Sequence, residues 1–222
     1  TNGTLWAWGS NSDGQLGQNS RSPAGMFSSP VQIGSATDWS TSGAGKIYID
    51  YNGAAIKTDG TLWMWGYNAR GTLGQNDTTY RSSPVQVPGT TWKSISNVSL
   101  GTIASKTDGT LWTWGYGVNG QLGLNSTADV SSPTQIPGTW SGVIGGGVYH
   151  GVATKTDGTL WAWGENEGGE LAQNMGPGSG DSGLFSSPVQ IGSSTGWSTT
   201  VGDQKISAGR FSGYSSAGIL YD

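Results

Sequence analysis

Residues 57–66 read KTDGTLWMWG, and three close copies of this phrase lie elsewhere in the chain. They are TNGTLWAWG at 1–9, KTDGTLWTWG at 106–115 and KTDGTLWAWG at 155–164. Each copy is followed by an Asn- and Gly-rich loop, an SSPxQ phrase and one isolated tryptophan. The first tryptophans of successive copies are 57, 49 and 49 residues apart. A period of about 50 residues is typical of a β-propeller or a solenoid, in which each repeat packs against its neighbours.

Each repeat is expected to contain several short β-strands. In TLWAWG, alternate residues point to opposite faces of a sheet and both faces are apolar, which indicates a strand covered on both sides. The preceding Thr-Asp-Gly or Thr-Asn-Gly predicts a tight hairpin turn, because these residues adopt positive φ angles. The SSPxQ phrase predicts a strand whose proline lies at its start or at a sheet edge. A strand before the hairpin turn and a segment ending at the isolated tryptophan complete a four-stranded antiparallel blade.

The twelve tryptophans, three in each repeat, are predicted to form the structural core. Burial of one indole removes about 150–250 Å² from water, which favours folding by about 4–6 kcal/mol as an upper value. Paired tryptophans can also form a platform that stacks on sugars, but their repetition in every unit favours packing. The predicted core residues are Trp6, Trp8, Trp39, Trp63, Trp65, Trp92, Trp112, Trp114, Trp140, Trp161, Trp163 and Trp197.

The composition favours an all-β fold in one domain. Forty glycines, eight prolines and only 11% charged residues leave no segment with apolar residues at helical spacing. A chain of 222 residues is long enough to bury a sizeable core. We expect a single β-propeller over residues 1–222, with repeats at about 1–45, 46–93, 94–142 and 143–204 and a closing strand at 205–222.

The pattern DGTLWAWGxNxxGQLG, followed by SSPVQI and an isolated tryptophan, resembles the repeat of the regulator of chromosome condensation family. The resemblance covers nearly the whole chain and implies four-stranded blades around a central axis. That family usually has about seven blades, whereas this chain has four repeats. Its founding member is a nucleotide-exchange factor for a small GTPase and binds chromatin. Nothing in this sequence matches a basic tail or an exchange-factor wedge, so no functional residue is transferred. The near-uniform repeats are more similar to those of bacterial surface and phage structural proteins.

The ends of the chain are expected to close the ring by strand pairing. The segment from Lys205 to Ala217 resembles the strand that precedes the hairpin turn, and the chain begins at that turn. Such pairing leaves no blade with an open edge. In the alternative interpretation, AGILYD at 217–222 is a degenerate fifth copy of DGTLW, which suits an open arc or a larger ring built from two chains.

Charge and composition restrict the partners. A formal net charge of −4 and scattered lysines and arginines disfavour nucleic acid, which requires a basic patch. No apolar run is long enough to cross a bilayer. Low charge with many Ser, Thr, Asn and Gly residues favours an extracellular or virion-associated location. Because the sequence begins with Thr1, we expect a processed chain or an excerpt. We expect a protein or glycan partner or self-assembly, and no cofactor.

No catalytic or metal site is predicted. His150 is the single histidine and cysteine is absent, which disfavours a zinc site and a nucleophile paired with histidine. A packing or surface role is expected for His150. Glu165, Glu167 and Glu170 lie in one turn-rich segment and predict a solvated loop rather than the acid pair of a glycosidase. No stretch has the spacing of a calcium loop or a phosphate-binding loop.

The repeats differ most in the loop before the SSP phrase. Repeats two and three have five residues there, whereas repeats one and four have eight and eleven. The two long loops end in apolar pairs, Met26-Phe27 and Leu184-Phe185. In a closed four-blade ring these loops are neighbours, which predicts a composite binding surface. The alternative is that Phe27 and Phe185 cap the core beneath their own loops.

The sequence therefore predicts a non-catalytic binding or assembly module, such as an adhesin-like protein or a virion structural or receptor-binding protein. By analogy with the family, the alternative is a guanine-nucleotide exchange factor or signalling regulator. A second alternative is a glycan-active enzyme that uses Glu165 or Glu170.

Overall fold

The computed structural model describes residues 2–21, 26–41, 46–173 and 183–200, and the backbone of two strands at 206–208 and 216–218. This part of the chain is all-β, with sixteen strands and no helix. In chain order they are β1 (Trp6–Ser10), β2 (Met26–Gln32), β3 (Ile47–Ile49), β4 (Asn52–Ile56), β5 (Leu62–Gly66), β6 (Arg81–Gln86), β7 (Trp92–Val98), β8 (Gly101–Lys106), β9 (Leu111–Gly115), β10 (Val130–Ile136), β11 (Trp140–Gly146), β12 (His150–Lys155), β13 (Leu160–Glu165), β14 (Leu184–Gln190), β15 (Ile206–Ala208) and β16 (Ser216–Gly218).

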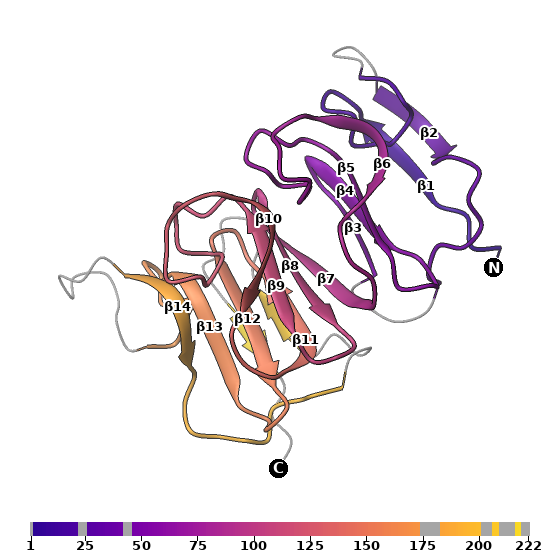
Figure 1. Ribbon diagram of the computed structural model, residues 1–222. Coiled ribbons are helices and arrows are strands. Elements are labelled where there is room, and N and C mark those ends of the chain that lie inside the picture. The colour runs from indigo at the N-terminus through magenta and orange to yellow at the C-terminus, as the bar shows by residue number, and fades with distance from the viewer. Residues whose placement is uncertain are drawn as a thin grey trace.

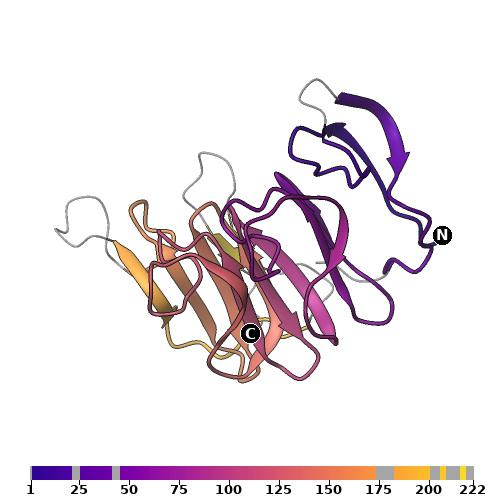
Figure 2. The ribbon, with the colours of Figure 1, turned by 45° about the horizontal axis from the view of Figure 1, so that its top comes forward.

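The strands form three four-stranded sheets and two two-stranded sheets, and every pairing is antiparallel. We call the pair β1-β2 blade 1, and the sheets β3–β6, β7–β10 and β11–β14 blades 2, 3 and 4. Figures 1 and 2 show the blades following one another in an arc. The first strands of neighbouring sheets, β3, β7, β11 and β15, contact one another in succession. The all-β class is therefore confirmed, and the four-stranded antiparallel blade is confirmed for blades 2, 3 and 4; blade 1 has two strands among the described residues.

The isolated tryptophan opens a blade instead of ending one. Trp92 and Trp140 are the first residues of β7 and β11, and Trp39 forms a bridge with Lys57 at the same position of blade 2. The expectation that this residue ends its own repeat is wrong because its ring packs against tryptophans of the blade that follows. The ring of Trp92, for example, makes T-shaped contacts with Trp112 and Trp114, at centroid distances of 6.4 and 5.8 Å.

The SSPxQ phrase forms the outer strands β2, β6, β10 and β14, each at the edge of its sheet. Pairing of β5 with β6 is interrupted between Val85 and Arg81, and Pro84 lies in this irregular stretch. A proline there removes no regular ladder hydrogen bond, and the bulge bends the edge strand.

The Asp-Gly-Thr-Leu-Trp phrase forms a hydrogen-bond relay at each hairpin turn. In blade 2, the Asp59 carboxylate accepts bonds from the Thr61 amide (2.9 Å) and hydroxyl (2.7 Å), and that hydroxyl accepts one from the Trp63 indole (2.9 Å). These hydroxyl and amide bonds hold the pKa of the Asp59 carboxyl below its usual value. The same relay occurs at Asp108-Thr110-Trp112, Asp157-Thr159-Trp161 and Asn2-Thr4-Trp6.

The core lies between successive blades. One apolar cluster joins blades 1 and 2, a second joins blades 2 and 3, and a third joins blades 3 and 4. The tryptophans that are at most 5% exposed are Trp39, Trp65, Trp92, Trp114, Trp140 and Trp163. Trp63, Trp112, Trp161 and Trp197 are half-buried.

Trp6 and Trp8 depart from the predicted core. They are 48% and 63% exposed, whereas Trp65, at the position of Trp8 in blade 2, is 1% exposed. Blade 1 begins the arc, so no preceding blade covers Trp8 as the Gln15 loop covers Trp65. Among the described residues blade 1 also has no first strand, so Trp6 has no counterpart of Trp39, whose ring packs against Trp63 at 6.5 Å. A buried role for these two residues is therefore wrong for a single copy of the chain.

The C-terminal strands continue the arc instead of closing it. β15 pairs with β16 and lies beside β11 and β12, while β1 pairs with β2 at the other end of the arc. Pairing of the N- and C-terminal strands is not found in the described part of the chain. Figure 1 shows blade 1 at the end of the arc away from blade 4. Residues 219–222 of the AGILYD segment lie outside the described residues.

Candidate functional site

Two sets of loops lie on the same side of the blades and are joined to each other. One connects the first and second strands of a blade, and the other connects the third and fourth. The Tyr67 amide donates to the Tyr51 carbonyl at 3.1 Å, and this bond recurs as Tyr116 to Leu100 at 3.0 Å and Glu165 to Tyr149 at 2.9 Å. We call this surface the loop face; it comprises the described residues of 11–21, 50–51, 67–80, 99–100, 116–129, 147–149 and 166–173.

A buried asparagine holds the long loop of blades 1, 2 and 4 in shape. The Asn68 side chain accepts from the Leu73 amide at 2.9 Å and donates to the carbonyls of Asp77 and Thr79, both at 3.0 Å. Asn11 and Asn166 accept the equivalent bond in blades 1 and 4. In blade 3 the position is Gly117, and the Asp129 carboxylate accepts from its amide instead. The loops are therefore fixed by the fold before any partner binds.

A cluster of tyrosines and one arginine occupies the loop face over blades 1 and 2. The rings of Tyr51 and Tyr67 are 6.2 Å apart, those of Tyr67 and Tyr80 are 5.0 Å apart, and the Arg21 guanidinium lies 4.3 Å from the centre of the Tyr80 ring. Tyr51 is 56% exposed. We call Tyr51, Tyr67, Tyr80 and Arg21 the tyrosine cluster. Exposed tyrosine and arginine are the residues that most often carry binding energy in protein interfaces.

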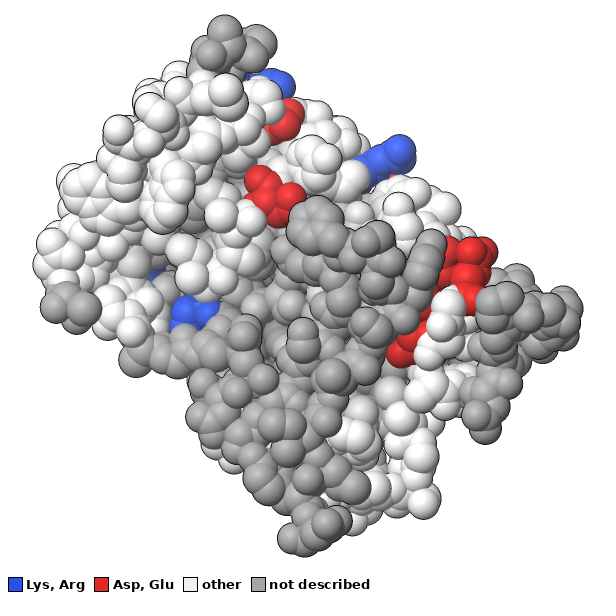
Figure 3. Space-filling model, turned by 180° about the vertical axis from the view of Figure 1, so that it is seen from behind, with Lys and Arg blue, Asp and Glu red and all other residues white. Residues whose placement is uncertain are grey.

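The charged side chains of the described surface are scattered. Seen from behind, this surface is mostly uncharged, with separate acidic and basic side chains (Figure 3). Among the described residues, ion pairs join Lys57 to Asp38, Arg70 to Asp129 and Arg81 to Asp77. Over the described residues, the lysines and arginines do not form the continuous basic track that nucleic acid requires.

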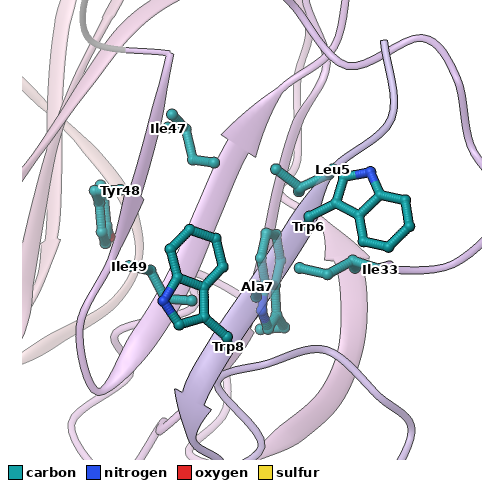
Figure 4. Close-up of a pocket in the computed structure, with 9 residues that line it drawn as sticks. Leu5, Trp6, Ala7, Trp8, Ile33, Ile47, Tyr48 and Ile49 are labelled. Atoms are coloured by element: carbon teal, nitrogen blue, oxygen red, sulfur yellow. The ribbon is translucent and has the colours of Figure 1, made fainter. Parts of the chain in front are cut away.

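A second candidate surface is the open side of blade 1. Trp6 and Trp8 on β1 and Ile47 and Ile49 on β3 surround a pocket of about 490 Å³ (Figure 4). Ile47 and Ile49 are 54% and 47% exposed. The complete lining is Leu5, Trp6, Ala7, Trp8, Ile33, Ile47, Tyr48, Ile49 and Trp65. An apolar pocket of this kind is suited to apolar side chains of a partner.

A family model for the regulator of chromosome condensation (RCC1) repeat matches residues 2–45, 59–102 and 108–153 of this chain. The chain belongs to the RCC1 repeat family. The resemblance inferred from the repeated Trp-bearing phrase is thereby confirmed.

Three solved structures show the same RCC1-type fold. Human WBSCR16 is 20% identical, with a TM-score of 0.71 over 100% of this chain and 54% of its own. Prp20p of Saccharomyces cerevisiae, in a structure described with its binding properties to Gsp1p and histones, is 17% identical to this chain. Its TM-score is 0.72, and the match covers 99% of this chain and 52% of Prp20p. Yeast RCC1 (Prp20) in a complex with Kap60 is 18% identical to this chain. Its TM-score is 0.73, and the match covers 99% of this chain and 51% of the yeast protein. This chain therefore spans about half the length of these proteins. No curated protein matches it.

The two apolar pairs predicted as binding residues lie on different RCC1 repeats. Met26 and Leu184 are 82% and 38% exposed, while Phe27 and Phe185 are half-buried against the apolar clusters of blades 1 and 4. Because β2 and β14 lie at opposite ends of the arc, one copy of the chain does not bring the pairs together (Figure 1). Residues 22–25 and 174–182 of these loops lie outside the described residues. A binding role for the four residues stays a prediction.

Among the acidic residues of blade 4, Glu170 stabilises its own loop. The Glu170 carboxylate accepts from the Gly168 amide at 2.9 Å, as the side chains of Gln15 and Gln121 do in blades 1 and 3. Burial, followed by repulsion from two neighbouring glutamates, raises the pKa of Glu165. Within the described residues, no group of three His, Cys, Asp or Glu side chains is placed to hold a metal ion. The same part of the chain contains no helix that could span a bilayer.

His150 is 3% exposed on β12, and burial lowers its pKa from 6.5 to about 4. The unfolded chain therefore binds a proton near pH 6.5 that the folded chain accepts only near pH 4, so stability falls as the pH drops through this window. Between pH 7 and pH 5 this residue is expected to remove about 2 kcal/mol from the free energy of unfolding. His150→Asn, which introduces the residue found at this position in blade 2, should abolish that part of the pH dependence. Urea unfolding at pH 7, 6 and 5 measures the free energy of unfolding of both proteins. If it fell equally with pH in the variant and in the unchanged chain, the prediction would be wrong.

Proposed function

We propose that this RCC1 repeat chain is a non-catalytic protein-binding module, and that its partner docks on the loop face at the tyrosine cluster. The observation that carries the proposal is the arrangement of Tyr51, Tyr67, Tyr80 and Arg21 over loops that hydrogen bonds already fix. A preorganised surface loses little conformational entropy on binding, so its aromatic contacts contribute more fully to affinity.

The comparisons support a protein as the partner. The yeast relative of the same fold is described with its binding to Gsp1p and histones and in a complex with Kap60. The net charge of −4 favours a partner with a basic surface, since opposite charge speeds association. An extracellular or virion-associated location, an adhesin role and glycan binding have support only from composition and stay predictions.

The test is binding of purified histones and of a panel of small GTPases to the chain and to a Tyr51→Ala/Tyr67→Ala variant. We expect at least one of these proteins to bind, and the double variant to bind at least about tenfold more weakly, because central interface tyrosines are common hot spots. Thr90→Ala is the control, since Thr90 is exposed on the opposite side of blade 2, outside the loop face. Binding unaffected by the double variant, or no binding to any of these proteins, would overturn the proposal.

Guanine-nucleotide exchange is the second candidate function, because the family's founding member is an exchange factor. Small GTPases loaded with a fluorescent guanine nucleotide would report it directly. If the chain accelerates nucleotide release and the Tyr51→Ala/Tyr67→Ala variant does not, exchange activity is assigned to the loop face. Binding without acceleration would restrict the chain to recognition.

A further inference from the structure

The lysines of the described chain lie on the side of the blades opposite the loop face, in two different settings. Lys57, Lys106 and Lys155 follow or end the second strand of blades 2, 3 and 4. The ammonium group of each lies over two tryptophan rings, at 3.6 to 5.5 Å from the ring centres. Lys46 and Lys93 belong instead to the first strands, and among the described residues no aromatic ring lies beneath them.

Lys46 and Lys93 form a ladder across three blades. Lys46 directly precedes β3, and Lys93 is the second residue of β7. The Lys46 ammonium group donates to the Lys93 carbonyl, and the Lys93 ammonium group donates to the carbonyl of Ser141 on β11 at 2.9 Å. Each lysine therefore reaches the first strand of the following blade. We call these two residues the lysine pair.

The backbone of β11 holds Lys93 in place. Gly142 has a φ of 91°. A Cβ on it would lie 3.2 Å from the Lys93 ammonium nitrogen and 3.2 Å from the Ser105 hydroxyl. Glycine at this position therefore leaves room for the lysine side chain beside a hydroxyl group. An ammonium group has three N–H donors, and each member of the pair uses one on a backbone carbonyl. The fold thus presents further donors in a fixed place.

No carboxylate neutralises the lysine pair within the described part of the chain. Strands β3, β7 and β11 contain no acidic residue. The acidic side chains on this side of the blades have other partners: Asp38 pairs with Lys57, while Asp59, Asp108 and Asp157 accept from the threonines of their own hairpin turns. Figure 3 shows basic side chains at the lower left of the view, away from the acidic ones.

The two positive charges of the pair act on each other. Both side chains are half-buried. Burial, followed by repulsion from Lys93, lowers the pKa of Lys46. Placing like charges together at a half-buried site costs free energy unless an opposite charge joins them. An anion that accepts hydrogen bonds from both ammonium groups supplies that charge.

We propose that the lysine pair binds a divalent oxyanion, either free phosphate or sulfate or the phosphoryl group of a small molecule, on the first strands of blades 2 to 4. Two ammonium groups balance two negative charges, and the oxygens of a tetrahedral anion accept charge-assisted hydrogen bonds from both. Lysine is a common phosphate ligand because it acts as a compact point charge. This site is on the opposite side of the blades from the tyrosine cluster, so it is independent of the protein partner proposed above.

Titration of the isotope-labelled chain with sodium sulfate and with sodium phosphate, followed by nuclear magnetic resonance, tests the proposal. Sodium chloride keeps the ionic strength constant. We expect saturable shifts of the amide resonances of Lys93 and Ser141 with both anions. Acetate, which has one charge, should bind at least about tenfold more weakly, because the attraction grows with charge. Phenyl phosphate separates the two sources: tighter binding than free phosphate indicates a phosphoryl group on a small molecule, and weaker binding indicates the free ion.

Lys46→Met/Lys93→Met removes both charges and keeps aliphatic side chains of similar length. It should weaken sulfate binding at least about tenfold, the loss expected for a hydrogen bond to a charged group. If the double variant does not fold, Lys46→Met alone gives the same test, because it leaves Lys93 in place over Gly142. Arg81→Gln is the control for loss of one positive charge, since Arg81 lies on the edge strand β6 and pairs with Asp77; it should leave the dissociation constant unchanged.

Two results would overturn the oxyanion site. One is the absence of saturable shifts with sulfate and phosphate, or equal binding by the folded lysine variant and the unchanged chain. The other is equal affinity for acetate and sulfate, which would show that the pair does not select a divalent anion. Neither result affects the tyrosine cluster, whose test measures binding of proteins.

Discussion

Trp114→Ala is expected to lower the free energy of unfolding by about 3–5 kcal/mol, the usual cost of removing a large aromatic side chain from a core. The Trp114 indole is 0% exposed, packs against Trp92 at 5.8 Å and donates to the Thr72 carbonyl of the preceding blade at 3.0 Å. Its removal leaves a cavity and an unpaired carbonyl at the contact between blades 2 and 3. Urea unfolding followed by tryptophan fluorescence measures the loss.

Trp8→Ala is the matched control, because Trp8 occupies the same strand position in blade 1 and differs only in what covers it. At 63% exposure, its loss should cost less than about 1 kcal/mol. Equal destabilisation by the two changes would show that burial between blades does not explain the role of these indoles.

Asn68→Ala is expected to lower the free energy of unfolding by about 1–3 kcal/mol. Asn68 is 0% exposed, and its removal leaves the buried Leu73 amide without its acceptor. The Asp77 and Thr79 carbonyls each lose one donor, although the Thr79 carbonyl still accepts from the Arg81 guanidinium at 2.7 Å. A buried polar group without a partner lowers the free energy of unfolding by about 1–3 kcal/mol, and water that enters the opened loop offsets part of this loss.

The control for Asn68 is Ser83→Ala, which removes one hydrogen bond to the Asn19 side chain at an exposed site. It should change stability by less than about 0.5 kcal/mol. Asn68→Ala should also weaken binding at the tyrosine cluster, because Tyr67 precedes Asn68 in the same loop. A stability loss as small as that of Ser83→Ala would mean that the loop holds its shape without the asparagine.

The tyrosine cluster was missed at the level of sequence for an identifiable reason. Its members come from separate segments, and only the fold brings Tyr51, Tyr67 and Tyr80 together. A signal was nevertheless present at the residue after each Trp-Gly, which is Ser10, Tyr67, Tyr116 and Glu165 in the four repeats. Variation at one position of an otherwise uniform phrase marks a surface that the scaffold leaves free to differ.

The sequence by itself determined the class of fold and the content of each blade. Every repeat carries the hairpin turn, the alternating strand and the edge proline, and these are local preferences that neighbouring residues satisfy. The Asp-Gly-Thr-Leu-Trp relay is local in the same sense, since its hydrogen bonds join residues two positions apart.

Only the tertiary structure decided which tryptophans are covered and whether the ends meet. Trp8 and Trp65 lie in nearly identical phrases, yet one is 63% and the other 1% exposed. Their difference arises because an indole on a third strand is buried by the preceding blade, which no residue of its own phrase specifies. The position of β1 relative to β15 is a tertiary property in the same sense, because it depends on how successive blades pack against one another.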